Sequence, residues 1–192
     1  MIHVRSTAAL ALATAAWLAS GSGPADGAST HGQRIVARAP LWDEPPATTG
    51  RDWRAIVVHH SASSVGNART FHAWHLGRGW DGLGYHFVIG NGAGMGDGEV
   101  AVGWRWVAQR EGAHAGETFH NQHGIGICLV GNFESAEPTP AQWTALVALV
   151  RRLALDHAIG ADAVLGHGQV KQSTACPGGQ FPLERLRAEL RP

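Results

Sequence analysis

The chain has 192 residues, of which 44% are hydrophobic and 16% are charged, so it is long enough for one domain with a substantial core. Its formal net charge is zero at neutral pH. No basic field is therefore available to attract nucleic acid or an anionic membrane surface over a long range, and a nucleic-acid partner is not expected.

The first 28 residues are typical of a signal peptide. The segment Met1 to Arg5 ends in a basic residue, an apolar run follows from Ala8 to Ala19, and small residues come next. The apolar run is shorter than the roughly 20 residues that cross a bilayer, which disfavours a permanent membrane anchor. The sequence thus predicts an exported protein, periplasmic or extracellular, with no integral membrane anchor after cleavage.

Residues 29–52 are rich in small and turn-forming residues and are expected to form a tether and an edge segment. The main domain is expected at residues 53–192. In chain order, its patterns predict a strand at Ile56–His60, a helix at Ala68–Leu76, strands at Gly84–Ile89 and Ile125–Val130, a helix from Pro140 to about His157, a strand at Ala163–Leu165 and a helix at Leu183–Leu190.

The long helix has the clearest signals, with Thr139 as N-cap and Pro140 at the first helical position. The continuous apolar run Ile125–Val130 is typical of a strand that is buried on both faces. Because strands and helices interleave, the sequence predicts the α/β class, as a single domain with a central mixed β-sheet flanked by helices. Trp74 and Trp143, on apolar helical stripes, are expected in the core. The segment 90–116 has few apolar runs and is expected to border a groove.

Two histidines and one cysteine from distant parts of the chain suggest a zinc site. One histidine is His59 or His60, whose side chains must point to opposite faces of the first strand, and the others are His167 and Cys176. Structural zinc sites usually have four protein ligands, whereas hydrolytic sites have three and leave one position open. A disulfide with Cys128 is the alternative for Cys176, but Cys128 lies in an apolar run where a small buried residue is the ordinary interpretation.

The order of these motifs resembles the zinc N-acetylmuramoyl-L-alanine amidases, a family that includes phage lysozyme-type amidases and animal peptidoglycan recognition proteins. The resemblance spans about residues 53–182 and includes His-x-Ser-Ala after the first strand, Gly166-His167 and Thr-x-Cys-Pro-Gly at 174–178. Further matching segments lie at Trp74–Trp80, Gly84–Ile89, Gly112–His114 and Ile125–Asn132. The family uses the first histidine of the pair, which implies His59, His167 and Cys176 as ligands of Zn²⁺.

The resemblance also implies roles for residues around the metal. Tyr85 lies in the segment where these amidases carry a tyrosine that hydrogen-bonds the attacking water, although most tyrosines in strands are packing residues. Thr174 takes the place of an assisting Lys or Thr, and its alternative role is to cap the loop backbone. Some members of the superfamily place a glutamate base where this chain has Cys128. Gly168 replaces a frequent arginine, so the sequence does not identify a group that orients the His167 ring.

Other residues of this type are expected to line the substrate site or to support it. His114 and Asn121 are expected in the peptide groove, and Trp80 is expected to offer an aromatic face to a sugar ring. The remaining histidines of the matching segments are expected to be core or supporting groups: His60, His75 and His86.

Taken together, the resemblance implies an exported, monomeric zinc hydrolase that cleaves the amide between N-acetylmuramic acid and L-alanine in bacterial peptidoglycan or muropeptides. A module that binds peptidoglycan without cutting it is the alternative, since part of the animal family does this and typically lacks the cysteine ligand. A zinc peptidase that acts within the stem peptide is a third interpretation. The residues by themselves support only a zinc hydrolase.

Overall fold

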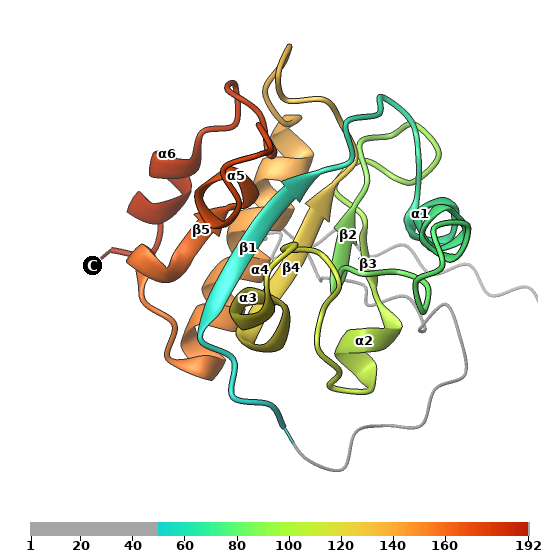
Figure 1. Cartoon of the computed structure of the whole chain (residues 1–192). Coiled ribbons are helices and arrows are strands. Elements are labelled where there is room, and N and C mark those ends of the chain that lie inside the picture. Colours follow the sequence, from blue (N-terminus) through green and yellow to red (C-terminus); the bar gives the residue numbers. More distant parts are fainter. Residues whose placement is uncertain (1–49, 192) are drawn as a thin grey trace, which may run out of the picture. The chain divides into compact units, whose positions relative to one another are not determined.

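The computed structural model describes residues 50–191, within which five strands form one sheet in the order β3-β2-β4-β1-β5 (Figure 1). The strands are β1 (Ala55–His60), β2 (Phe87–Ile89), β3 (Val100–Val102), β4 (Gly124–Leu129) and β5 (Val164–Gly166). β1 pairs in parallel with β4 and β5, and β4 pairs in parallel with β2, whereas β3 is antiparallel to β2. The sheet is therefore mixed, with its antiparallel strand at one edge.

Helices cover both faces of this sheet. They are α1 (Ala68–Leu76), α2 (Trp104–Val107), α3 (Thr118–His123), α4 (Pro140–His157), α5 (His167–Val170) and α6 (Leu183–Ala188), with a 3₁₀ turn η1 at Ala161–Ala163. Ile127 and Leu129 of β4 belong to the buried cluster under α4, while Cys128 belongs to a second cluster that contains Phe71 of α1. Since side chains of a strand alternate between faces, α4 and α1 lie on opposite sides of the sheet (Figure 1).

The same alternation decides which histidine of β1 faces which side. Ile56 and Val58 join the core under α4, so His59 points to the other face, where only 1% of it is exposed. The sequence left this choice open. The structure places His59 on the face of the sheet opposite α4.

The N-terminus of α4 is tied to the ends of two strands. The Thr139 side chain accepts a hydrogen bond from the Gln142 N–H, and the Gln142 side chain accepts one from the Thr139 N–H. The buried Gln142 amide also donates to the carbonyls of Ile89 and Val130. The capping box fixes the first turn of α4, and the two Gln142 hydrogen bonds fix its position relative to the ends of β2 and β4.

The predicted α/β class, with one domain built on a central mixed sheet, is confirmed. α1 and α4 have the predicted bounds, and the other long patterns agree to within a few residues. One strand is shorter than predicted: β2 begins at Phe87 rather than Gly84, because the Gly84 carbonyl accepts a hydrogen bond from the Ala113 N–H instead of pairing within the sheet. The last helix likewise ends at Ala188 rather than Leu190.

Short elements were missed by the sequence patterns. β3 and α2 lie within segment 90–116, and α3 follows it. Each has three to six residues, too few for a period to be recognised. The prediction that Trp74 is a core residue is wrong, because Ala68, Phe71 and His75 form the buried stripe of α1 and leave Trp74 48% exposed. Trp143 does pack against the core, half-buried.

Within residues 50–191, no helix has both the length and the hydropathy of a membrane-spanning segment. The predicted signal peptide and most of the predicted tether and edge segment lie outside the described residues.

Candidate metal centre

Three side chains from separate segments meet at the carboxyl ends of β1 and β5. β5 runs parallel to β1 with Val58 paired with Gly166, so His167 follows the sheet at the level of His59. Cys176 reaches the same place from the loop after α5. One ligand atom from each of the three residues lies within 4.8 Å of the others. The structure therefore brings together the three predicted ligands.

Hydrogen bonds hold the cysteine in this cluster. Its Sγ lies 3.7 Å from Nδ1 of His59 and accepts a hydrogen bond from the His60 N–H at 3.4 Å. The Thr174 hydroxyl oxygen accepts a hydrogen bond from the Cys176 N–H at 3.2 Å, so Thr174 does cap the loop backbone. Both Cys176 and Cys128 are free and buried, which rules against the alternative of a disulfide.

All three ligands are neutral without a metal. Burial lowers the pKa of His59 well below 6.5 and also lowers the pKa of His167. Burial raises the pKa of the Cys176 thiol to about 11, against the opposing effect of the His60 N–H. A divalent cation that enters must therefore displace the thiol proton and finds two imidazoles that already have a lone pair.

In each ligand histidine, the hydrogen-bond partner of one ring nitrogen determines which nitrogen faces the metal cluster. Nε2 of His167 donates to the Ala115 carbonyl at 3.1 Å, and Nε2 of His59 lies 3.0 Å from Nδ1 of His114. Ala115 thus supplies the orienting group for His167 that the sequence did not reveal. Two imidazoles and one thiolate suit zinc, a borderline-soft ion, and leave a coordination position open. The residues present fit the predicted metal.

The other predicted supporting histidines have structural roles. Nδ1 of His86 accepts a hydrogen bond from a β4 N–H, that of His75 from the Gly84 N–H, and that of His60 from the Phe133 N–H. Each ring therefore stabilises a backbone group at an element end or in a loop. This agrees with the prediction that they are core or supporting groups.

Tyr85 lies beside the metal cluster, just before β2. The centroid of its ring is 5.1 Å from that of His59 and 5.4 Å from that of His75, and the residue is half-buried. Burial, followed by the thiols of Cys128 and Cys176, raises the pKa of Tyr85 well above 10. Its hydroxyl therefore stays protonated near neutral pH and acts as a hydrogen-bond donor, not as a charged base.

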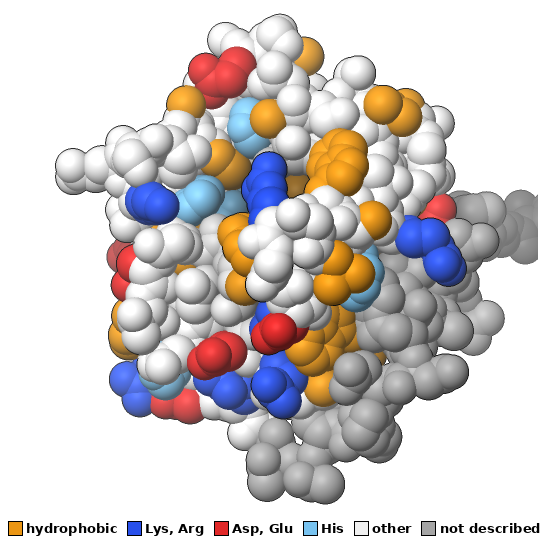
Figure 2. Space-filling model, turned by 45° about the vertical axis from the view of Figure 1, so that its right-hand side comes forward, with side chains coloured by type: hydrophobic (Ala, Val, Ile, Leu, Met, Phe, Trp, Pro, Cys, Tyr) orange, Lys and Arg blue, Asp and Glu red, His pale blue; other side chains and the backbone are white. Residues whose placement is uncertain are grey.

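A pocket of about 470 Å³ adjoins the cluster and has His167 in its wall. The three residues predicted to bind substrate, Trp80, His114 and Asn121, all line it. Trp80 is 39% exposed, so its ring is available to a ligand. Figure 2 shows histidine, basic and hydrophobic side chains close together in the upper half of one face of the molecule.

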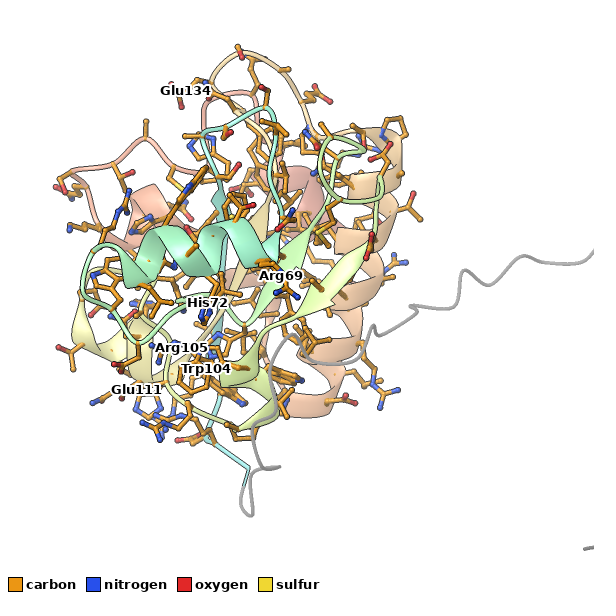
Figure 3. All side chains as sticks on the ribbon, turned by 90° about the vertical axis from the view of Figure 1, so that its right-hand side faces the viewer. Arg69, His72, Trp104, Arg105, Glu111 and Glu134 are labelled. Carbon is orange, nitrogen blue, oxygen red and sulfur yellow. The ribbon has the colours of Figure 1, made fainter. Side chains whose placement is uncertain are left out.

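Sequence reasoning missed two cations of the pocket, Arg105 and Lys171. Arg105 is buried and donates to the carbonyls of Leu83 and Glu111, and its guanidinium lies over the Trp104 ring. Figure 3 shows Arg105 beside Trp104, below α1. The signal for Lys171 was available, since it is the only lysine of the chain and follows His167 by four residues.

A three-ligand cluster with an open coordination position, at the end of a mixed sheet and beside a pocket, is the arrangement of a metal-dependent hydrolase. Residues 49–179 match the model of the family described as N-acetylmuramoyl-L-alanine amidase. The chain belongs to this family.

Individual relatives and a solved structure agree with this assignment. The endolysin of Escherichia phage T7 is 36% identical over 140 residues, which cover 68% of this chain and 83% of that protein. The pig N-acetylmuramoyl-L-alanine amidase is 34% identical over 143 residues, or 64% of this chain and 21% of the enzyme, so the chain spans only about a fifth of its length. The N-acetylmuramoyl-L-alanine amidase LysC from Clostridium intestinale superposes with a TM-score of 0.66 and 32% identity, over 80% of this chain and 98% of that chain.

Proposed function

We propose that the chain is an exported zinc N-acetylmuramoyl-L-alanine amidase that hydrolyses the amide between the muramic lactyl group and L-alanine of bacterial peptidoglycan. The observation that carries this proposal is the cluster of His59, His167 and Cys176, which retains all three ligands and opens beside a pocket. Family membership adds the identity of the scissile amide. The same three residues would hold zinc.

Bound zinc would supply a Lewis acid for the amide carbonyl and would make a water molecule nucleophilic near neutral pH. Tyr85, as a neutral phenol close to His59, donates a hydrogen bond that orients the attacking water. The Thr174 hydroxyl accepts the Cys176 N–H and keeps its own proton available for the oxygen of the scissile carbonyl. A hydroxyl brings no positive charge, so its contribution is smaller than that of a cation.

The pocket next to the cluster is proposed to hold the substrate on both sides of the scissile bond. The exposed face of Trp80 would pack on a sugar ring, and Asn121 and His114 would border the peptide. We propose a monomer that acts on peptidoglycan or soluble muropeptides in the periplasm or outside the cell, with residues 1–28 as the signal peptide.

The test is mass spectrometry of peptidoglycan fragments after incubation with the purified protein, with and without a zinc chelator. We expect release of intact stem peptides with a free L-alanine amino terminus, lost with the chelator and with Cys176→Ala. Cys128→Ala is the matched control for metal content, because it removes the other buried thiol but no ligand, and it should retain one zinc per chain. Binding without cleavage would favour the recognition module, and cuts between stem residues would indicate a peptidase.

A further inference from the structure

The partner of His59 decides which of its nitrogens faces the metal. Nε2 of His114 lies 3.2 Å from the Gly124 carbonyl, which can only accept a hydrogen bond, so this Nε2 carries the ring's proton. With the proton on Nε2, the Nδ1 atom of His114 is the acceptor side of the ring, and it faces Nε2 of His59. Nε2 of His59, 3.0 Å away, must then be the donor, which leaves its Nδ1 unprotonated. That Nδ1 is the atom next to the Cys176 sulfur.

The next residue in the chain does the same for the second ligand. The Ala115 carbonyl accepts the hydrogen bond from Nε2 of His167 at 3.1 Å, so the proton of that ring also lies on the side away from the cluster. Two consecutive residues therefore orient both imidazoles, although the ligands are 108 residues apart in the sequence, His59 in β1 and His167 at the start of α5.

Asn121 of α3 holds these two consecutive residues in place. Its Oδ1 accepts the N–H of His114 at 2.9 Å and the N–H of Ala115 at 2.9 Å. One side-chain oxygen thus fixes the backbone that carries both orienting groups.

Glycines provide the space in which the His114 ring sits. A Cβ atom on Gly126 of β4 would lie 2.4 Å from Cδ2 of the ring, and one on Gly112 would lie 2.3 Å from the same atom. The ring is held between two backbone surfaces, and 6% of the residue is exposed. Its position is therefore determined by the fold and not by a ligand.

We propose that His114 and Asn121 are positioning residues of the metal centre, which hold His59 and His167 as the tautomers that present Nδ1 to the metal before it binds. This inference rests on the metal-binding part of the proposed function. It assigns to two residues of the pocket wall a role beyond contact with substrate. Ligands that are already oriented lose little freedom when the metal enters, and loss of such outer partners typically lowers metal affinity by about 10- to 100-fold.

The experiment compares two pairs of variants of the full chain. His114→Leu removes the acceptor for His59, whereas His114→Asn keeps an oxygen near the place of Nδ1. Asn121→Leu removes the acceptor for both backbone N–H groups, whereas Asn121→Asp keeps it. Zinc affinity is measured by competition with a chelator, and the imidazole tautomers of the metal-free protein are read from two-bond proton–nitrogen correlations in NMR spectra.

We expect both ligand histidines of the metal-free protein to carry their proton on Nε2. We expect the leucine variants to bind zinc about 10- to 100-fold more weakly and the asparagine and aspartate variants to recover most of this loss. Asn121→Leu should disturb the signals of both ligand rings, and His114→Leu mainly that of His59. A proton on Nδ1 of His59 in the metal-free protein would overturn the inference, as would folded leucine variants that bind zinc as tightly as the unchanged protein.

These readouts do not depend on cleavage. A protein that shows the expected tautomers and the expected order of zinc affinities but cuts no muramoyl amide would support the positioning role and refute the proposed amidase activity. An active amidase whose leucine variants keep full zinc affinity would refute the positioning role alone.

Discussion

Replacing Gly126 with alanine tests whether packing holds the His114 ring in place, and it removes no polar group. Gly126 lies inside β4, in extended backbone that alanine tolerates. Its new Cβ would lie 2.4 Å from Cδ2 of His114 and 2.7 Å from Cγ, about 1 Å inside ordinary contact distance. The ring cannot retreat, because the position of a Cβ on Gly112 is only 2.3 Å away on another side. We expect the ring to be displaced and its hydrogen bond with His59 to be lost.

Displacement of the His114 ring should lower both the stability of the protein and its affinity for zinc. Overpacking of a close-packed interior typically costs 1 to 3 kcal/mol of unfolding free energy, which should appear in the urea midpoint of the metal-free protein. Loss of the acceptor for His59 should weaken zinc binding by roughly 10- to 100-fold, or about 1.4 to 2.8 kcal/mol. Chelator competition on the folded protein separates the second effect from the first.

Gly160→Ala is the matched control. This glycine has no heavy atom within 4 Å of the place where a Cβ would lie, and its φ of −72° suits alanine. The control should change neither stability nor zinc affinity by more than a small amount. If Gly126→Ala folds and binds zinc as tightly as the control, the packing argument for His114 is refuted.

Four other changes test the cluster. Tyr85→Phe removes the hydroxyl but keeps the ring beside His59, so turnover of muropeptides should fall about 100-fold or more while zinc affinity is unchanged; a loss of zinc would contradict the role in orienting water. Thr174→Val should lower turnover about tenfold or more and Thr174→Ser should retain it, whereas equal rates for the two would leave the hydroxyl without a role. Because burial raises the pKa of Cys176 to about 11, zinc binding must release the thiol proton. The association constant for zinc should therefore rise about tenfold per pH unit from pH 7 to 9. A constant that does not change with pH would show that the thiolate is already present. Burial lowers the pKa of His86 to about 4, so the unfolded chain takes up this proton first as the pH falls below 6.5. His86 alone should cost the metal-free protein about 2 kcal/mol of stability by pH 5. Because burial also lowers the pKa of His59 and His114, the total loss in urea titrations should be at least this large, and constant stability would contradict the prediction.

The parts of the fold that could be predicted are those with a sequence period. The 18 residues of α4 repeat an apolar stripe several times and have a capping box, and β1 and β4 are runs of β-branched and apolar residues. β3, α2 and α3 have only three to six residues each, too few to show a period in the sequence. Trp74 was misplaced because the helical stripe does not reveal which side of a short helix meets the sheet.

The site divides in the same way. The residue types of a zinc cluster were readable, but the choice of His59 over His60 came from the family resemblance, since alternation alone allows either face. The link between His59 and His114 joins residues 55 positions apart, and no local pattern encodes it. The sequence predicted His114 and Asn121 as groove residues, and both do line the pocket. Their hydrogen bonds toward the metal cluster are visible only in three dimensions.

Because His114 both lines the pocket and contacts a metal ligand, a loss of activity in its variants can have two causes. His114 has one edge in the wall of the pocket and its Nδ1 on a metal ligand, so a variant that loses activity has not thereby lost a contact with substrate. Trp80 lines the same pocket. Among residues 50–191, the rings of His59 and His167 have hydrogen-bond partners other than Trp80. Loss of Trp80 should raise KM with zinc content unchanged, whereas loss of His114 should lower zinc content first. Activity measured at saturating zinc would hide the difference, because excess metal refills a weakened site, so zinc affinity has to be measured before any pocket residue is assigned to substrate binding.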